Sequence, residues 1–418
     1  MYTSWTRTFP RLYQVKQAAA CYFTSKPSRP SDEGYTTALR KASEIFRLPS
    51  RINPLHINDS INYYTKLDRS PGLPYTKEGL KRKDEVDPNR IKSFVHNLKY
   101  GMYQKCFTPC TAAVKTMVSQ KNKFRLIWAY PAHMTFAEGM FAQPLIWNYE
   151  SLRGSYALWV QYSKGDMRSL MSRRCPGQKW IGIDWSSFDA TVPAWLIRDA
   201  FNILRDNLDF SRYHEWGVPS DDGTLTRLWS EVVNYFINTP IRFQDGVVWK
   251  KRRGIPSGSY FTNLIDSVVS AIVMNYLLDI QGAQFYMGDD SLIAVKEADL
   301  RQLAERADKI FGMILNEDKS ELGTHVSFLG YKMGLDGAPL ASYNKLVAQL
   351  LVPSSPDRSL GEFVTRARAL QLSCFGRGCW QFTYQVQAIL DDIGLDFQPC
   401  LHSRDETMVK LSMLDLAG

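Results

Sequence analysis

The sequence lacks any run of about 18 apolar residues, the length that a membrane-spanning helix needs. The nearest candidate, from Val268 to Leu278, is shorter and follows Asn263 and Asp266. The N-terminal segment is basic but has no apolar region after it, so no secretory signal is visible. These absences predict a chain without a transmembrane segment.

Cysteine is also scarce, and its number is odd. Seven cysteines are scattered between Cys21 and Cys400, as is typical of reduced thiols in an intracellular protein rather than of a disulfide framework. Cys106 and Cys110 are closely spaced, and so are Cys374 and Cys379. Neither pair has a matching second half with histidine, which argues against a zinc site.

Length and charge indicate what kind of protein this is. At 418 residues the chain exceeds what one hydrophobic core usually supports, so two or three subdomains are expected. Its 51 basic and 42 acidic side chains give a net charge of +9. That excess suits a polyanionic partner, with nucleic acid as the first candidate and a membrane surface as the second. No internal repeat or low-complexity tract is present.

Two adjacent carboxylates, Asp289 and Asp290, follow Gly288 between the apolar runs Phe285–Met287 and Leu292–Val295. This pattern predicts a β-hairpin whose tight turn carries acid at its tip. Two like charges roughly 4 Å apart repel by about 4 kcal/mol at an effective dielectric of 20, so a divalent cation is the expected compensation. Hard oxygen ligands favour Mg²⁺. Taken alone, the three residues are more typical of a solvated turn than of a metal site.

A further acidic position follows the strand-like segment Trp180–Ile183, which ends at Asp184. Asp189 comes next, and apolar residues then recur at helical spacing from Val192 to Leu208. The pattern predicts strand, acidic turn and helix. A carboxylate at the C-terminal end of a buried strand lies where α/β-type sheets bind ligands. For Asp189 the dipole of a nearby helix N-terminus is an alternative explanation.

Three cations alternate with other residues at Lys121, Lys123 and Arg125, directly before Leu126–Trp128. Side chains at alternate positions share one face of a strand, so the three would form a row. Such a row matches a triphosphate, because lysine provides point charges and arginine a planar fork for phosphate oxygens. A solvated edge strand with lysines is the alternative.

The basic run Lys250–Arg253 precedes a loop of small residues, Gly254–Ser259, that opens a long helix. Basic runs are usually solvated, but this position favours contact with phosphate. Ser257, Thr262 and Asn263 add polar groups, although Thr and Asn are also ordinary capping residues. The buried stripe of the helix is predicted to be Phe261, Leu264, Ile265, Val268, Ile272 and Tyr276.

The remaining pattern predicts a helix over Leu300–Phe311, a strand at Met313–Leu315, and one alternating strand over Val326–Met333. From about Leu346 the pattern is helical, with a break at Pro353–Pro356. The apolar stripes of these helices are predicted at Leu360, Phe363, Ala367 and Leu370, and again near Trp380, Tyr384 and Ile389.

Asp184 lies 105 residues before Asp289, yet both lie at strand ends. If the strands are neighbours in one sheet, these residues and Asp290 converge. Three carboxylates can hold two cations roughly 3.5–4 Å apart, which clamp the attacking and leaving oxygens of a phosphoryl transfer. The cations around Arg125 would then neutralise the leaving diphosphate.

The ordered series of these segments resembles the motifs of viral RNA-dependent RNA polymerases, most closely those of partitivirus-like double-stranded RNA viruses, with picobirnaviruses as near relatives. The segments that carry the resemblance are Ser70–Pro74 (a template-entrance loop), Lys121–Pro131 (a basic fingertip motif), Asp184–Asp189, Pro256–Asn263 and Gly288–Ser291 (three palm motifs), Asn316–Ser320 and Phe328–Tyr331.

The resemblance implies an α+β right-hand polymerase fold with fingers, a palm of antiparallel sheet flanked by helices, and a small helical thumb. Residues 1–179 would form an N-terminal extension and the fingers, 180–214 and 254–345 the two parts of the palm, 215–253 a fingers insertion and 346–418 the thumb.

The resemblance also implies roles for individual residues. Asp184, Asp289 and Asp290 would bind two Mg²⁺ ions, for which Mn²⁺ is a substitute, and Lys319 would be the general acid for the departing pyrophosphate. Nucleoside triphosphate would contact Lys121, Lys123, Arg125, Asp189, Ser257, Thr262 and Asn263, with Asp189 and Asn263 sensing the ribose 2′-hydroxyl. RNA would contact Ser70, Gly72, Arg252, Arg253, Gly258, Phe328, Leu329 and Gly330.

The implied activity is template-directed RNA synthesis that replicates and transcribes a viral double-stranded RNA genome. Its partners would be template RNA, product RNA and nucleoside triphosphates, with a viral capsid protein as a further candidate, and its location the virion interior or the host cytoplasm. Two alternatives remain open. A reverse transcriptase shares the two-metal chemistry but normally has an aromatic residue at the position of Asp189, and a catalytically idle particle protein would use only the basic surface to bind RNA.

Overall fold

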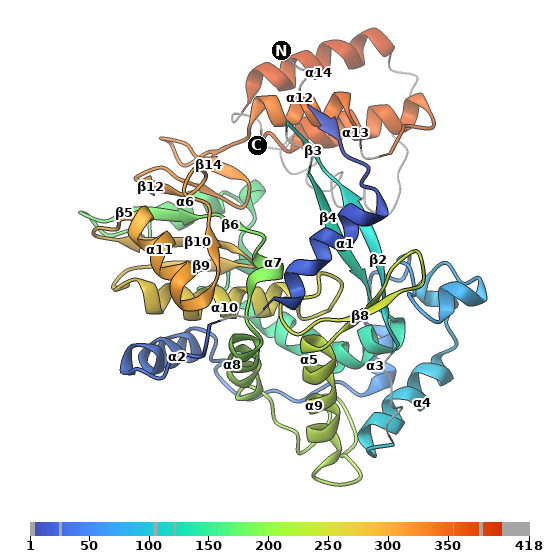
Figure 1. Ribbon diagram of the computed structural model, residues 1–418. Helices are drawn as coiled ribbons and strands as arrows, with labels where there is room; N and C mark the ends of the chain where they lie inside the picture. Colours follow the sequence, from blue (N-terminus) through green and yellow to red (C-terminus); the bar gives the residue numbers. More distant parts are fainter. Residues whose placement is uncertain are drawn as a thin grey trace.

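The computed structural model describes residues 5–24, 27–102, 108–120, 123–353, 355–375 and 379–394. Figure 1 shows short sheets between helices, with three C-terminal helices at one end of the molecule. The first half contains β1 (Thr6–Arg7), α1 (Leu12–Ala20), α2 (Glu33–Ile45), α3 (Ile57–Asn62), α4 (Pro88–Lys99), β2 (Cys110–Thr116), β3 (Val118–Ser119), β4 (Phe124–Ala129), α5 (Ala132–Ser151) and α6 (Asp166–Met171).

The middle of the chain alternates between the two types of element. It contains β5 (Lys179–Ile183), β6 (Trp185–Ser186), α7 (Phe188–Thr191), α8 (Ala194–Arg205), α9 (Thr224–Ile237), β7 (Pro240–Arg242), β8 (Val248–Lys250), α10 (Thr262–Leu277), β9 (Gln284–Met287), β10 (Asp290–Val295) and α11 (Leu300–Phe311). The C-terminal part contains β11 (Ile314–Leu315), β12 (Glu321–Gly323), β13 (Ser327–Phe328), β14 (Tyr331–Met333), β15 (Pro339–Leu340), α12 (Tyr343–Leu351), α13 (Leu360–Leu372) and α14 (Trp380–Ile393).

The central sheet is antiparallel and has the order β12-β5-β10-β9. The predicted hairpin is confirmed, because β9 and β10 pair around a two-residue turn and Asp290 faces Met287. The predicted neighbourhood is also confirmed, since β10 pairs with β5 in a register that places Ser291 opposite Ile183. In this way the chain brings together strands that are far apart in sequence.

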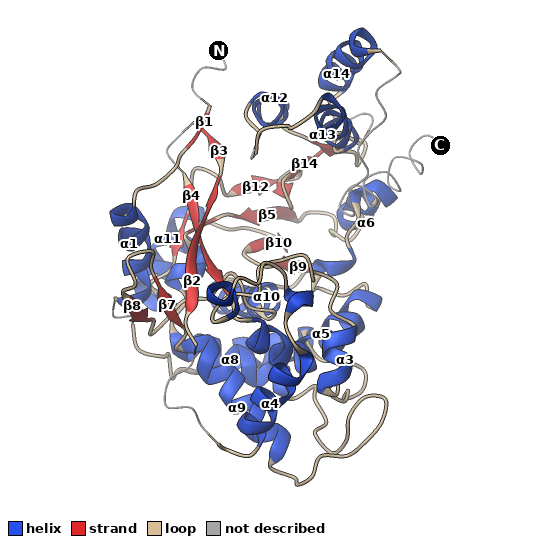
Figure 2. Ribbon diagram, turned by 90° about the vertical axis from the view of Figure 1, so that its right-hand side faces the viewer, coloured by secondary structure: helices blue, strands red, loops and turns tan. Residues whose placement is uncertain are grey.

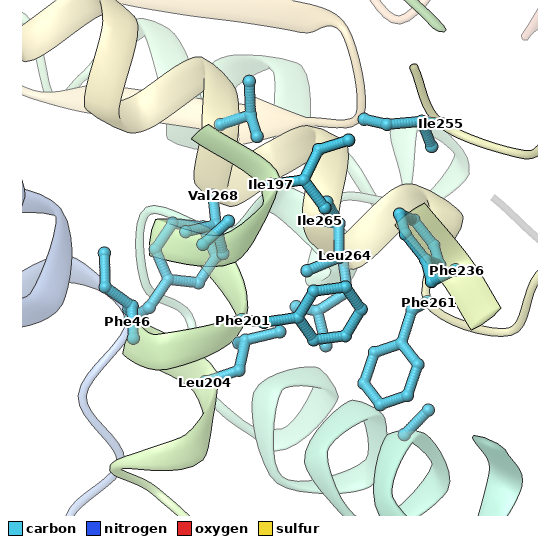
Figure 3. Close-up of a cluster of buried hydrophobic side chains, with 14 of the residues drawn as sticks. Phe46, Ile197, Phe201, Leu204, Phe236, Ile255, Phe261, Leu264, Ile265 and Val268 are labelled. Atoms are coloured by element: carbon cyan, nitrogen blue, oxygen red, sulfur yellow. The ribbon is translucent and has the colours of Figure 1, made fainter. Parts of the chain in front are cut away.

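Helix α10 packs against the central sheet and anchors it to the helical core. Its residues from Leu264 to Met274 are all buried, so this helix is apolar on nearly every side. Figure 3 shows Phe261, Leu264 and Ile265 facing Phe201 of α8 and Phe236 of α9. The Phe201 ring lies edge-on to Phe261, with centroids 5.2 Å apart.

A second four-stranded sheet has the order β4-β2-β7-β8. In it, β2 pairs antiparallel with β4 and parallel with β7. The α9–β8 segment, predicted as a fingers insertion, therefore adds two strands to the sheet that carries Arg125. Among the described residues, no helix combines the length and the apolar character that crossing a membrane requires.

The single strand predicted over Val326–Met333 is wrong. The segment is a hairpin, in which Phe328 of β13 pairs with Tyr331 of β14. Leu329 and Gly330 form the turn with φ of +48° and +83°. Glycine accepts this left-handed conformation without a steric cost, and this allows the alternating segment to reverse direction.

The apolar stripe predicted for α14 is also wrong. Trp380 and Tyr384 are 73% and 74% exposed, and Ile389 is 40% exposed. The buried face consists instead of Phe382, Val386 and Leu390, which share a small core with α12 and α13. Both sets recur at helical spacing, so periodicity alone did not reveal which face meets the neighbouring helices.

The N-terminal strand links the β2–β3 tip to the C-terminal helices. β1 pairs with β3 at the tip next to β2, and Figure 1 shows it beside α12. The Arg7 guanidinium donates from Nε to the Val352 carbonyl oxygen (3.0 Å) and from Nη1 to the Thr116 carbonyl oxygen (3.1 Å). Arg7 therefore joins the β2–β3 tip to the C-terminal helices.

The substitution Arg7→Ala should loosen the junction between the β2–β3 tip and the C-terminal helices while leaving the core intact. Hydrogen bonds from a charged group contribute about 1.5–3 kcal/mol each, so amide hydrogen exchange in β3 and at the end of α12 should accelerate by at least about tenfold. Mass spectrometry of peptides from these segments measures the change. The control Arg301→Ala removes only an exposed ion pair with Glu305 and should leave exchange unchanged. Equal exchange in Arg7→Ala and wild type would contradict the junction.

Candidate active site

Three carboxylates meet at one end of the central sheet. Asp184 directly follows β5, and Asp290 begins β10. Because Ser291 pairs with Ile183, Asp290 and Asp184 occupy the next positions of the same antiparallel ladder. Asp289 lies beside them in the hairpin turn, after Gly288 with φ of +67°. The structure thus brings together the three residues predicted to bind metal.

The electrostatics of this cluster confirm that its members interact. Burial and the charges of Asp289 and Asp184 together raise the pKa of Asp290 to about 7. Burial and the charge of Asp289 raise the pKa of Asp189 to about 6. Arg125 opposes both shifts, which places its guanidinium near the same carboxylates.

The carboxylates do not form a closed metal cage. Within the described part of the chain, no three His, Cys, Asp or Glu side chains are grouped closely enough to hold an ion. A cation at this position would therefore need oxygen ligands from a bound substrate as well. Mg²⁺ commonly binds in this way, through one or two carboxylates plus substrate phosphates.

Two buried serines of α10 hold the turn that carries Asp289. The Gly288 amide donates to Ser267 Oγ (2.7 Å), and Ser270 Oγ donates to the Gly288 carbonyl oxygen (3.0 Å). The backbone N–H and C=O groups of Gly288 are thereby both hydrogen-bonded. The sequence analysis missed these residues, although two serines spaced by three on an otherwise apolar helix were a visible signal.

Asp266 is another acidic residue that the sequence analysis did not assign. It lies on α10, is 5% exposed, and its Oδ1 has no hydrogen-bond partner among the described residues. Burial raises its pKa well above the usual range, and the charges of Asp189 and Asp289 raise it further. Asp266 therefore belongs to the same acidic cluster, behind the hairpin turn.

Cations face this cluster from two directions. Arg125 lies on β4 and Lys123 directly precedes it, whereas Lys121 lies outside the described residues. Lys319 Nζ is 3.8 Å from Asp184 Oδ2. Burial lowers the pKa of Lys123, and the positive charge of Lys319 lowers it further, so these two ammonium groups are close. The structure thus brings Lys123, Arg125 and Lys319 to the acidic edge.

The loop before α10 lies directly against β4. A Cβ atom at Gly258 would come within 1.8 Å of the Trp128 carbonyl oxygen, so only glycine fits there. Ser257 Oγ accepts from the Trp128 amide (3.3 Å), and Thr262 Oγ1 donates to the Pro256 carbonyl oxygen (2.7 Å). The Ser257 and Thr262 hydroxyls therefore shape the loop.

Asn263 faces the hairpin turn. Its Oδ1 accepts a hydrogen bond from Tyr156 Oη (2.7 Å). Its Nδ2 lies 3.0 Å from the position that a Cβ atom would take at Gly288. The side chain is exposed, so its amide is accessible beside Asp289.

Glu138 of α5 supports the same loop from behind. It is fully buried, and its Oε2 accepts from Ser259 Oγ (2.7 Å) and from the Tyr260 amide (2.7 Å). Burial raises its pKa to about 8, which keeps the carboxyl protonated at neutral pH. The sequence analysis missed it, although a single acid within the apolar stretch Ala132–Leu145 was a signal.

Two of the four residues of the basic run before this loop are turned inward, contrary to the prediction for Arg253. Lys251 is fully buried and donates to the carbonyl oxygens of Phe236 and Ile237, at the C-terminus of α9. The last carbonyls of a helix lack internal partners, which explains why the ammonium is held there. Arg253 is 6% exposed and donates to the Cys21 carbonyl oxygen, so its guanidinium does not face RNA. Arg252 is exposed.

The remaining predicted RNA contacts lie on two loops. At Gly72, with φ of +67°, a Cβ atom would come within 2.5 Å of the Tyr130 carbonyl oxygen, and the Gly72 amide donates to Ser70 Oγ (3.3 Å). Phe328 is buried, whereas Leu329 and Gly330 line a cavity of about 390 Å³. Lys345 of α12 lines the same cavity, so the β13–β14 hairpin and the C-terminal helices face each other across it.

Comparison with known proteins agrees with this geometry. A family model described as viral RNA-dependent RNA polymerase matches residues 21–378. The RNA-directed RNA polymerase of Cryptosporidium parvum virus 1 (strain KSU-1) is 28% identical over 391 residues, which cover 85% of this chain and 72% of the relative. A genome polyprotein of Ornithogalum mosaic virus is 28% identical over 191 residues, 42% of this chain and 16% of the polyprotein.

Solved structures show the same fold. The RNA-dependent RNA polymerase of a human picobirnavirus superposes with a TM-score of 0.69 and 15% identity over 90% of this chain and 74% of the other. Its insertion-loop deletion mutant gives a TM-score of 0.72 and 14% identity over 92% and 78%. The predicted α+β right-hand architecture is therefore confirmed.

Replacing Glu138→Gln should flatten the pH dependence of stability. The ordinary pKa of 4.5 is raised to about 8 in the folded chain, so the folded state retains a proton that the unfolded state releases between these values. The free energy of unfolding of the wild type should therefore fall as pH rises from about 5 to 8. Glutamine keeps an acceptor for Ser259 and Tyr260 but does not ionise.

Urea denaturation at pH 5 and pH 8 measures this slope. The control Glu305→Gln changes an exposed carboxylate on α11 and should keep the wild-type slope. If Glu138→Gln and wild type lose stability equally over this range, Glu138 is not protonated in the folded chain.

Proposed function

The chain belongs to the viral RNA-dependent RNA polymerases, and we propose from this membership that it replicates and transcribes a double-stranded RNA genome. It would transfer nucleotides from nucleoside triphosphates to the 3′ end of a growing RNA, by a two-Mg²⁺ mechanism. One observation carries the proposal: Asp184, Asp289 and Asp290 project from adjoining strand ends and face Lys123 and Arg125.

The donor set fits Mg²⁺. Asp184, Asp289 and Asp290 offer hard oxygen ligands. Burial and the charges of the other two carboxylates raise the pKa of Asp290, and a divalent cation would relieve this excess of negative charge. Bound Mg²⁺ would supply Lewis-acid stabilisation of the attacking 3′ oxygen and of the phosphate charge. Mn²⁺ accepts the same oxygen ligands and is a substitute.

The surrounding cations would handle the triphosphate. Lys123 and Arg125 would hold its β- and γ-phosphates while the 3′ oxygen bonds to the α-phosphorus and the bond to the β-phosphate oxygen breaks. Lys319, which reaches the acidic edge beside Asp184, would donate a proton to the leaving pyrophosphate. Lys121 is proposed for the same triphosphate contact from sequence alone.

Sugar selection would depend on Asp189 and Asn263. The 2′-hydroxyl both donates and accepts hydrogen bonds, so a carboxylate and an amide together match it. Ser257 and Thr262 would contribute indirectly, because their hydroxyls are bonded to backbone within the loop that positions Asn263.

The template and product strands would follow the two loops. Ser70 and Gly72 would guide the template, Gly258 and Arg252 would contact backbone, and Phe328–Gly330 would support the growing end. We also propose the domain limits given by the sequence, a virion or host-cytoplasmic location, and a capsid protein as a partner. Each rests on the resemblance to the family.

Asp289→Asn should reduce the rate of RNA synthesis by at least about a thousandfold, while RNA affinity and its salt dependence remain nearly unchanged. The substitution removes one charge from the cluster but keeps its size. Incorporation of labelled nucleotides on single-stranded RNA with Mg²⁺ measures activity, and filter binding measures affinity. Asp308→Asn, on α11, is the control. Normal incorporation by Asp289→Asn would refute the metal assignment, and deoxynucleotide preference in the wild type would indicate a reverse transcriptase.

Asn263→Ala should reduce discrimination against deoxynucleotides, about tenfold, with little effect on RNA affinity. The amide lies beside the hairpin turn, and its loss removes one hydrogen-bond partner of the 2′-hydroxyl. The ratio of kcat/KM for ATP and dATP measures this. The control Tyr156→Phe keeps the Asn263 amide but removes the hydrogen bond that Tyr156 Oη donates to it. An unchanged ratio in Asn263→Ala would exclude Asn263 as the sugar sensor.

A further inference from the structure

A basic cavity lies away from the acidic edge, between α3 and α4. It has a volume of about 490 Å³, and its lining includes His56, Lys92, His96 and Lys99. None of its described lining residues is acidic. Figures 1 and 2 show α3 and α4 at the end of the molecule opposite the C-terminal helices. No role proposed above uses this surface.

The positive charge of the cavity is poorly compensated. Lys99 is 8% exposed, and within the described chain its ammonium donates only to the Tyr213 hydroxyl (2.8 Å). Lys92 forms no ion pair with any residue that the structure describes. Asp59 is the nearby carboxylate and affects His56, but it is buried outside the cavity lining. An anion in the cavity would therefore meet two lysines, Lys92 and Lys99, and no carboxylate from the cavity lining.

Exposed aromatic rings pack on the two histidines that line the cavity. Trp216 is 53% exposed and packs on His56, with ring centroids 4.7 Å apart and planes inclined by 37°. Tyr100 is 42% exposed and packs on His96 at 4.5 Å and 41°. Both histidines line the cavity. A basic groove with exposed rings at its rim is the combination that binds single-stranded nucleic acid, since phosphates meet the cations and bases stack on the rings.

The cavity continues toward the template-entrance loop. A neighbouring cavity of about 410 Å³ shares Ser93 and Asn97 with it and reaches Pro74 and Tyr75. Pro74 is the last residue of the loop Ser70–Pro74. The two cavities are neighbours on α4, and the second is also lined by Asp87 and Arg90; we call the pair the α4 trough.

We propose that the α4 trough binds single-stranded template RNA before it reaches the Ser70–Pro74 loop. Lys92 and Lys99 pair with phosphates, and Trp216 and Tyr100 stack with bases. This contact reads no sequence, because every base has a stacking face, and it weakens as salt rises. The proposal rests on the polymerase function for the identity of the strand, and it assigns to α4 a role outside nucleotide addition.

The test compares two templates in variants Trp216→Ala and Lys92→Ala. One template is too short to extend beyond the Ser70–Pro74 loop, and the other carries a long single-stranded 5′ extension. For the long template, Trp216→Ala should raise Kd about tenfold. Lys92→Ala should lower the slope of log Kd against log salt concentration by the contribution of about one phosphate contact. Synthesis on the short template should equal that of wild type in both variants.

Matched controls remove the same chemistry elsewhere. Trp380→Ala deletes another exposed tryptophan, on α14, and Lys309→Ala deletes an exposed lysine on α11. Both should bind the long template like wild type. As a direct readout, ultraviolet crosslinking of a long template with 4-thiouridine in its extension should yield a crosslinked peptide that contains Trp216 or Tyr100.

The outcomes separate this proposal from the function itself. If wild type makes no RNA on either template, the polymerase function fails, whatever the trough binds. If wild type is active but Trp216→Ala and Lys92→Ala bind the long template normally, the trough does not bind RNA and a different partner occupies it. If inorganic phosphate at matched ionic strength competes as well as a single-stranded oligonucleotide does, the site is a simple anion pocket and the proposal is overturned.

Discussion

The structure depends on holding like charges together at the edge of one sheet. Burial and the like charges of Asp289 and Asp184 both raise the pKa of Asp290. Separation is opposed by the backbone pairing of β5 with β10 and by the two serine hydrogen bonds to the Gly288 peptide. The apolar body of α10 fixes this arrangement to the core behind it. In the function proposed above, a bound cation would relieve this repulsion.

Sequence patterns predicted this edge well, because its parts are local. A glycine and two acids between apolar runs specify a hairpin, and a carboxylate after an apolar strand specifies an acidic strand end. Their meeting was inferred from shared chemistry, and the register of β5 with β10 confirms it. The resemblance to a family added the order of the motifs, which no single motif contains.

Errors arose where a neighbour distant in sequence decides the outcome. The basic run was predicted to contact phosphate, but carbonyl groups of α9 and of Cys21 hold Lys251 and Arg253 inside the protein. Glu138 could not be predicted as a loop support, since its partners follow it by more than a hundred residues. On α14 two faces fit the helical period equally, and only the packing of α12 and α13 selects Phe382 and Val386. In each case periodicity specified the element but not its partner.

The two hydrogen bonds of Arg7 have a consequence for movement of the C-terminal helices. Because this side chain joins the β2–β3 tip to the end of α12, it connects the sheet that carries Arg125 to the C-terminal helices. Movement of the C-terminal helices away from this sheet would therefore break at least one of the two hydrogen bonds of Arg7.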